Sequence, residues 1–239
     1  MNREHTLDGQ VALITGASRG IGLAIARRLG QMGARVSLCA RKKPDLESAA
    51  SGLRADGIEV WASPADVTRA DEVSKLVAET QRAFGSIDIL VNNAGIGLFG
   101  SFYHQTDEDW NSVLDTNLKS AFLTSRAVAP EMIRRKSGHI INISSLAGKS
   151  TFANGAIYCA SKWGLLGLTG CMAEDLRVHG IRVSAICPGT VATEFSPHAG
   201  KDPSKMLQPD DVAHAVAALV TQSPGSFISA LDIRPAQKP

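Results

Sequence analysis

Long apolar runs and a dominant charge are both absent from this sequence of 239 residues. A membrane-spanning helix needs about 20 apolar residues in a row, and no such run occurs, so we expect no membrane partner. The formal net charge of +2 neither favours nor excludes nucleic acid, but Lys and Arg form no long run, and we expect no nucleic-acid partner. The N-terminal segment MNREHTLDGQ carries charges and no apolar stretch, which predicts no secretory signal.

Cysteine is scarce, and its four positions form no metal or redox motif. Cys39 and Cys187 lie in apolar, strand-like runs, whereas Cys159 and Cys171 have no CxxC partner and no His at metal spacing. Buried free thiols fit a reducing compartment, so we expect a cytoplasmic protein. The six histidines are scattered and form no cluster with Asp or Glu, so we expect no metal.

Apolar runs and helical periodicity alternate along the chain. Runs that predict strands occupy residues 11–15, 35–40, 58–61, 87–91, 139–143, 181–187 and 227–233. Segments that predict helices occupy residues 21–32, 44–55, 71–84, 107–136, 158–179 and 210–220. This pattern predicts an α/β fold, a doubly wound parallel sheet of about seven strands with helices on both faces. We expect one domain over residues 1–239, with an irregular substrate loop at about 194–208.

A glycine-rich turn, TGASRGIG at residues 15–22, joins the first predicted strand to the first helix. In a doubly wound sheet this turn is where a pyrophosphate rests on a helix N-terminus. Gly16 permits the tight turn, and Gly20 and Gly22 let backbone and helix approach closely. The spacing differs from G-x-G-x-x-G, so a plain strand–helix turn remains an alternative to a dinucleotide site.

This turn and several motifs after it resemble the short-chain dehydrogenase/reductase family. NNAG follows the fourth predicted strand at residues 92–95, DTNLKS contains Asn117, and INISS ends the fifth strand. YCASK contains Tyr158 and Lys162, and PGTVAT follows the sixth strand. The resemblance runs from about residue 10 to residue 193. It implies a single Rossmann-like domain, a nicotinamide cofactor and oxidoreductase activity.

The resemblance also implies where the cofactor lies. Asp66 is expected to meet the adenine amino group, although an Asp there could instead cap the next helix. Thr193 is expected to meet the nicotinamide amide or a phosphate. The residues that the family pattern assigns to the cofactor are Gly16, Ser18, Arg19, Gly20, Ile21, Gly22, Arg41, Asp66, Val67, Asn92, Ala94, Gly95, Tyr158, Lys162, Pro188, Gly189, Val191 and Thr193.

The end of the second predicted strand indicates NADP(H) rather than NAD(H). A carboxylate there accepts from the ribose 2′-hydroxyl of NAD, but this chain has Ala40 followed by Arg41. Arg41 and Arg19 suit the nearly dianionic 2′-phosphate of NADP(H). Helix phase is expected to place the acids Asp45 and Glu47 beyond the ribose. The alternative is that Arg41 only solvates the start of a helix.

Tyrosine is rare in this chain, and one of its two copies, Tyr158, stands four residues before Lys162. Residues at this spacing share one face of a helix. A free tyrosine has a pKa of about 10, and a cation beside it is expected to lower that value and make the phenol a usable proton donor. The alternative is a half-buried Tyr with a Lys that reaches for solvent.

Two further side chains complete the expected catalytic set with Tyr158 and Lys162. The family's catalytic serine usually lies thirteen residues before the tyrosine, which selects Ser145, whereas Ser144 is expected to bond strand-end backbone. In the family, the Asn at the position of Asn117 fixes a helix irregularity whose carbonyl holds a water bound to the lysine. A solvated Asn is the alternative.

The resemblance thus implies an NADPH-dependent reductase of a small carbonyl compound. A 3-oxoacyl thioester on acyl-carrier protein is one candidate substrate, because the lysines Lys149, Lys201 and Lys205 lie near the expected mouth; a generic apolar pocket with surface lysines is an equal alternative. The expected pocket walls are Gly97, Leu98, Phe99, Leu146, Lys149, Phe152, Asn154, Phe195 and Met206.

Three other classifications remain at this point: a reductase of another small ketone, a non-catalytic NADP sensor, and a sugar-nucleotide epimerase. The catalytic set argues against a sensor, and the roughly 45 residues after Thr193 leave little room for an epimerase's substrate domain. The long helices at 107–136 and 158–179 usually form a subunit contact in the family, so we expect a homodimer or homotetramer.

Overall fold

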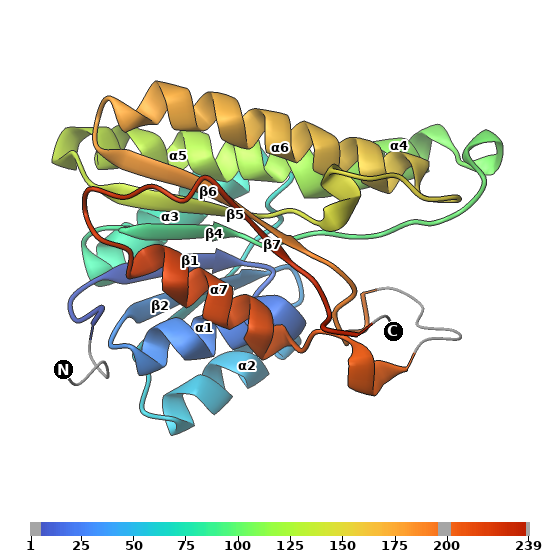
Figure 1. Cartoon of the computed structure of the whole chain (residues 1–239). Helices are drawn as coiled ribbons and strands as arrows, with labels where there is room; N and C mark the ends of the chain where they lie inside the picture. Colours follow the sequence, from blue (N-terminus) through green and yellow to red (C-terminus); the bar gives the residue numbers. More distant parts are fainter. Residues whose placement is uncertain (1–5, 196–201, 238–239) are drawn as a thin grey trace.

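The computed structural model describes residues 6–195 and 202–237 and contains one parallel seven-stranded sheet (Figure 1). Its strands lie in the order β3-β2-β1-β4-β5-β6-β7. They are β1 (Val11–Thr15), β2 (Arg35–Ala40), β3 (Val60–Pro64), β4 (Ile89–Asn92), β5 (Gly138–Ile143), β6 (Ile181–Pro188) and β7 (Ala230–Ile233). All five residues of β1 are buried, as expected for a central strand covered on both faces. The predicted α/β class and the single doubly wound domain are confirmed.

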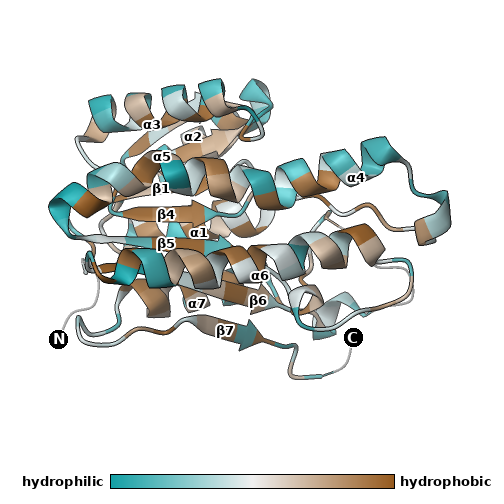
Figure 2. Cartoon of the chain, turned by 90° about the horizontal axis from the view of Figure 1, so that it is seen from above, coloured by the Kyte–Doolittle hydropathy of each residue, from teal (hydrophilic) through white to brown (hydrophobic). Residues whose placement is uncertain are grey.

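Helices cover both faces of the sheet. They are α1 (Gly20–Gln31), α2 (Lys43–Ala55), α3 (Ala70–Phe84), α4 (Asp107–Leu114), α5 (Ser120–Arg135), α6 (Ala156–Arg177) and α7 (Pro209–Val220). One apolar core joins the sheet to α1, α2 and α7, and a second joins it to α3, α5 and α6. Figure 1 shows these two helix layers on opposite sides of the strands, and Figure 2 shows apolar residues concentrated on the strands.

The strand order reverses between β1 and β4, because the chain winds outward from β1 to β3 and then returns to pair β4 with β1. In an open parallel sheet this reversal leaves a crevice outside the carboxyl ends of the strands. The glycine turn follows β1 and the NNAG segment begins at the end of β4, so both face this crevice.

The predicted helix 107–136 is not a regular α-helix. A π-helical turn, Asp115–Lys119, separates α4 from α5, and the amide of Ser120 donates to the carbonyl of Asp115. The start of α4 is fixed by a capping box in which Thr106 and Asp109 bond each other's backbone amides. The irregularity implied by the family resemblance is therefore present, whereas periodicity alone predicts an unbroken helix.

The predicted loop 194–208 has an anchored base. Val191 pairs with Leu207 in an isolated bridge, and the amide of Ala192 donates to the carbonyl of Leu207 over 2.8 Å. A short 3-10 turn, Pro203–Lys205, lies within the segment. Residues 196–201, and with them Lys201, lie outside the described residues.

No helix in the described parts of the chain is long and apolar enough to cross a membrane. The four cysteines are free; Cys39, Cys159 and Cys187 are buried and Cys171 is exposed. Among residues 6–195 and 202–237, no group of three or more His, Cys, Asp or Glu side chains is arranged to hold a metal ion.

Candidate active site

A cavity of about 1490 Å³ runs along the carboxyl ends of the strands. It begins at the glycine turn and the ends of β2 and β3, passes the loop after β4, and ends among the loops after β5, β6 and β7. The sequence-predicted residues that line it are Gly16, Ser18, Arg19, Gly20, Ile21, Arg41, Asp66, Val67, Ala94, Gly95, Ser145, Tyr158, Lys162, Pro188, Gly189, Val191 and Thr193.

The glycine turn packs directly on the loop after β4. Gly16 has a φ of +64°, and a Cβ there would lie 2.9 Å from the Cα of Ala94. The side-chain amide of Asn93 donates to the carbonyls of Thr15 at 2.9 Å and Gly16 at 3.1 Å. The backbone is thus held open at the N-terminus of α1, a geometry that accepts an anionic diphosphate.

Two predicted cofactor residues do not line the cavity. A Cβ on Gly22 would meet the side chain of Asn93 at 2.5 Å, so this glycine serves the packing of α1. Asn92 is turned to the opposite face, where it donates to Asn142 over 2.8 Å and to Ser125 over 3.0 Å. Strand alternation explains this orientation: Asn92 shares the face of Leu90, which packs on α3 and α5, and the neighbouring Asn93 faces the turn.

The end of the cavity beside the glycine turn and the ends of β2 and β3 is rich in charge. Ala40, Arg41 and Lys42 line it, and no carboxylate of a described residue lies within ion-pair distance of Arg41 or Lys42. Asp45 also lines the cavity, from the first turn of α2, and its expected place beyond the ribose stays a prediction. Glu47 is turned away toward Arg54 at 3.9 Å.

Asp66, which follows β3, also lines this end of the cavity. Desolvation opposes ionisation of its carboxyl, but hydrogen bonds from the Thr68 amide and hydroxyl and the charges of Arg41 and Arg69 outweigh it and lower the pKa of Asp66. The bonds to Thr68 measure 2.9 and 2.7 Å. Asp66 thus orders the turn before α3 and remains an anion at the cavity wall.

An ion pair crosses the cavity at the glycine turn. Arg19 donates to the carboxylate of Glu194 over 2.6 Å, and both side chains are more than 70% exposed. Glu194 follows β6, so the pair joins two segments that are 175 residues apart in sequence. The sequence predicts a 2′-phosphate contact for Arg19 and gives no role to Glu194.

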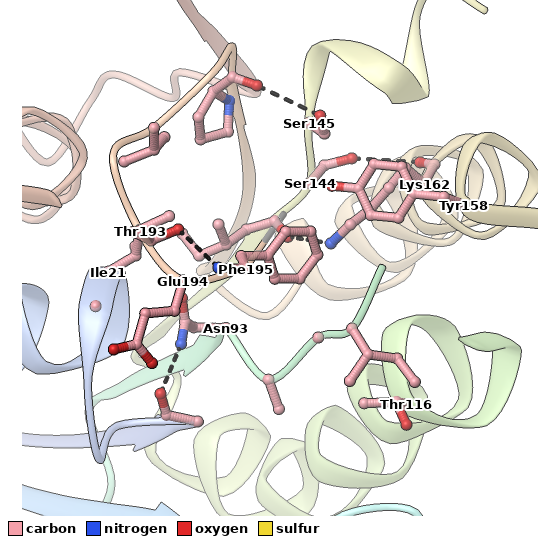
Figure 3. Close-up of a pocket in the computed structure, with 18 of the residues that line it drawn as sticks. Ile21, Asn93, Thr116, Ser144, Ser145, Tyr158, Lys162, Thr193, Glu194 and Phe195 are labelled. Carbon is pink, nitrogen blue, oxygen red and sulfur yellow. Dashed lines mark hydrogen bonds between the residues drawn. The ribbon is translucent and has the colours of Figure 1, made fainter. Parts of the chain in front are cut away.

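Tyr158 and Lys162 lie on one face of α6 and are both buried. The Lys162 ammonium lies 5.9 Å from the centre of the Tyr158 ring and donates to the carbonyl of Ile143 over 2.9 Å. Figure 3 shows both residues beside Ser144 and Ser145 at the end of β5. The Ser145 hydroxyl also lies 3.4 Å from the carbonyl of Pro188, and Ser144 bonds the carbonyl of Lys162, as expected of a strand-end backbone partner.

The electrostatics of the pair differ from the sequence-based expectation. Burial raises the pKa of Tyr158 to about 12, and a hydrogen bond with the Ser145 side chain opposes that rise. Burial also lowers the pKa of Lys162 to about 8. The expected lowering of the tyrosine pKa by Lys162 is therefore wrong for the protein alone, because desolvation outweighs a cation that is turned toward Ile143. At neutral pH the phenol holds its proton and the amine keeps its charge.

Asn117 lies in the π-helical turn and not on the cavity wall. Its side chain accepts from the amide of Ile96 at 2.8 Å and donates to the carbonyl of Ile96 at 2.9 Å. It also donates to the hydroxyl of Ser161 over 3.0 Å, and Ser161 bonds the carbonyl of Tyr158. Asn117 therefore joins the loop after β4 to the turn of α6 that carries the Tyr–Lys pair.

The expected pocket walls divide into two sets. Phe99, Leu146, Phe152 and Phe195 line the cavity. The remaining candidates stand outside its lining: Gly97, Leu98, Lys149, Asn154 and Met206. Lys149 binds Asp232 at 2.6 Å and Lys205 binds Asp202 at 3.7 Å, so both cations near the expected mouth are paired.

Comparison with known proteins decides the family of this chain. A family model described as short chain dehydrogenase matches residues 10–204. The chain belongs to the short-chain dehydrogenase family. Dehydrogenase/reductase SDR family member 4 of Bos taurus is 39% identical over 206 residues, which cover 86% of this chain and 74% of the bovine protein.

Two solved members of the short-chain dehydrogenase family extend the comparison over nearly the whole chain. A metagenomic short-chain oxidoreductase in complex with NADP is 45% identical, with a TM-score of 0.86 over 97% of this chain and 99% of that one. A variant of actinorhodin polyketide ketoreductase with NADPH is 35% identical, with a TM-score of 0.89 over 97% and 98% of the two chains. The fold and the order of its elements are therefore those of the family.

Proposed function

We propose that this short-chain dehydrogenase reduces a small ketone or aldehyde with NADPH. The observation that carries the proposal is one cavity that unites the open turn at Gly16, the free cation of Arg41 and the buried Tyr158–Lys162 pair. The solved relatives that contain NADP or NADPH support the choice of cofactor. When bound, NADPH supplies a hydride for the carbonyl carbon.

The chain's own side chains supply the proton and the polarity. With a pKa of about 12, Tyr158 is protonated at neutral pH and can donate to the carbonyl oxygen as negative charge develops there. Ser145 lies beside the phenol and can donate a hydrogen bond to the same oxygen. Lys162, with a pKa of about 8, stays charged at pH 7 and stabilises the phenolate that remains. Asn117 holds this turn of α6 in place.

The preferred substrate is a free small molecule rather than a carrier-bound thioester. The lysines that favoured an acidic carrier protein are neutralised in part, because Lys149 binds Asp232 and Lys205 binds Asp202. We further propose a homodimer formed through the helices α4, α5 and α6. Trp110, Phe122 and Trp163 are 50%, 42% and 51% exposed on these helices, a pattern typical of an interface. A cytoplasmic location remains a prediction.

The test is the loss of the reduced-nicotinamide absorbance with a panel of carbonyl compounds, with NADPH and NADH in parallel. The panel contains short diketones, cyclic ketones, quinones, and 3-oxoacyl thioesters in free and carrier-bound form. We expect turnover of at least one free ketone and a preference for NADPH. Tight NADPH binding without reduction of any carbonyl would instead identify a nucleotide sensor.

A further inference from the structure

Three phenylalanines surround the proton donor. The ring of Phe99 lies 5.5 Å from the ring of Tyr158 in an edge-to-face arrangement, and the ring of Phe195 lies 5.8 Å from it. Phe152 continues the wall, 6.0 Å from Phe99. Figure 3 shows the ring of Phe195 beside Tyr158. These rings come from three loops, those after β4, β5 and β6, and all of them line the cavity.

The backbone leaves room for this wall at two glycines. A Cβ on Gly97 would lie 2.7 Å from Phe99 and 3.0 Å from Phe195, and a Cβ on Gly155 would lie 2.5 Å from Phe152. Any larger residue at either position would displace a ring. The glycines therefore permit the rings to stand where they do.

The wall is also held in place. The amide of Gly100 donates to the carbonyl of Asn154 over 2.9 Å, and the Ser101 hydroxyl lies 3.2 Å from the Asn154 side chain. These bonds tie the loop of Phe99 to the loop of Phe152. The rings nevertheless remain 38–49% exposed, a large apolar surface for three side chains that no described residue covers.

Most charged side chains of the cavity lie at the end away from these aromatic rings. Arg19, Arg41, Lys42, Asp45 and Asp66 line the cavity at the glycine turn and the ends of β2 and β3. Near the rings, Lys162 is buried against Ile143, and Glu194 is turned away to Arg19. Two charged wall residues of the described chain on this side form no ion pair: Lys162, which bonds a backbone carbonyl, and Arg234, after β7.

We infer that the substrate is a neutral carbonyl compound that carries an aromatic ring. This inference rests on the proposed reductase function and specifies its substrate class. With the carbonyl oxygen at Tyr158 and Ser145, the ring of such a compound would lie against Phe99, Phe152 and Phe195. Aromatic rings attract one another beyond the effect of buried area alone, because the edge of one ring faces the electron-rich face of the next.

The experiment compares two ketones with the same chain and a six-membered ring that is aromatic in one and saturated in the other, 4-phenylbutan-2-one and 4-cyclohexylbutan-2-one. Neither carbonyl is conjugated, so the two share the same intrinsic reactivity. We expect kcat/KM with NADPH to be about 3- to 10-fold higher for the phenyl compound. The anionic 4-oxopentanoate is expected to be the poorest of the three, because its carboxylate would be desolvated against the rings.

Variants of the wall test whether the phenylalanine rings cause the preference for the phenyl ketone. Phe99→Leu and Phe152→Leu should each reduce the phenyl-to-cyclohexyl ratio to below about 2-fold, while NADPH affinity and thermal unfolding stay close to those of the parent. Phe102→Leu is the matched control, because Phe102 is 72% exposed, packs on Tyr103 and does not line the cavity. Its ratio should equal that of the parent.

A binding readout separates failure of the inference from failure of the proposed function. The product alcohols 4-phenylbutan-2-ol and 4-cyclohexylbutan-2-ol are titrated calorimetrically into the complex with NADPH, where no reaction can occur. Tighter binding of the phenyl alcohol supports the inference even if no carbonyl is reduced, an outcome that would overturn only the reductase function. Equal binding of the two alcohols, a phenyl-to-cyclohexyl kcat/KM ratio near one, or a preference for 4-oxopentanoate overturns the inference. Reduction of butane-2,3-dione in the same assays would then show that the reductase function stands.

Discussion

The two ends of the cavity are built by different means. The end proposed to hold the nucleotide (the nucleotide end) consists of short continuous segments, the glycine turn and the residues that follow β2 and β3, and it carries several charged side chains. The end proposed to hold the carbonyl compound (the carbonyl end) is lined by side chains from three distant loops and from α6, among them four aromatic rings. A short continuous segment can be identified from sequence motifs, whereas a wall built by distant loops becomes visible only in the folded chain.

Substitution of Tyr158 should affect carbonyl reduction far more than nucleotide binding, and its effect should be the largest. Tyr158→Phe removes the proton donor, so we expect kcat for ketone reduction to fall about 10²- to 10⁴-fold. The dissociation constant for NADPH, measured by calorimetry, should change little. Tyr103→Phe is the control, because Tyr103 is 70% exposed and outside the cavity. Reduction at the parent rate by Tyr158→Phe would rule out this role.

Substitution of Arg41 should affect only the nucleotide end. Arg41→Ala removes a charged donor to the 2′-phosphate, so the dissociation constant for NADPH should rise about 10- to 100-fold. The constant for NADH should stay the same, as should kcat at saturating NADPH. Arg82→Ala, an exposed position on α3, serves as the control. Equal weakening of both nucleotides would show that Arg41 does not read the phosphate.

The pH dependence of carbonyl reduction should follow the charge of Lys162, whose pKa is lowered to about 8 by burial. Above that pH the amine loses its charge while Tyr158, with a pKa of about 12, keeps its proton. With NADPH as the varied substrate, kcat/KM should be flat below about pH 8 and fall about tenfold per unit above it. In Arg41→Ala, kcat/KM should begin to fall at the same pH, because Arg41 lies at the nucleotide end, away from Lys162.

The same lowered pKa makes a separate prediction for stability. In the unfolded chain Lys162 regains its ordinary pKa of 10.5, so between about pH 8 and 10 the unfolded state binds more protons than the folded state. The free energy of unfolding should therefore rise with pH over this window, by at most about 1.4 kcal/mol per unit. Denaturant unfolding of the parent and of Lys162→Met measures the difference, and a parallel pH slope in the two would contradict the shift.

The smallest effect is expected where the two ends meet, at Glu194. Glu194→Gln releases Arg19 and removes a negative charge from the cavity mouth, so NADPH should bind about 2- to 5-fold more tightly at low salt. The gain should be smaller for NADH and should vanish near 0.5 M salt. Glu108→Gln, an exposed site on α4, is the control. Unchanged NADPH affinity at low salt would show that the ion pair does not compete with the nucleotide.

The sequence predicts the fold well because apolar runs typical of strands alternate with segments of helical periodicity. It predicts the π-helical turn at Asp115–Lys119 only through family resemblance, because one inserted residue per turn leaves no mark on hydrophobic periodicity. The cofactor role expected for Asn92 stays a prediction, although strand alternation turns its side chain to the face opposite that of Asn93.

Other features of the site cannot be read from sequence. The raised pKa of Tyr158 depends on how deeply α6 buries the phenol and on the direction in which Lys162 turns. The pairing of Lys149 with Asp232 joins residues 83 positions apart. Both depend on tertiary packing, which local patterns do not encode.

Glu194 and Phe195 are neighbours in the chain, yet one reaches the glycine turn and the other reaches Tyr158. If Arg19 bound a phosphate in place of Glu194, the segment that carries Phe195 would keep the bond from its amide to the Thr193 hydroxyl but would lose the ion pair. We therefore expect a dinucleotide that displaces this ion pair to alter how firmly the Phe195 segment is held, and so to alter how tightly a ketone binds beside Tyr158.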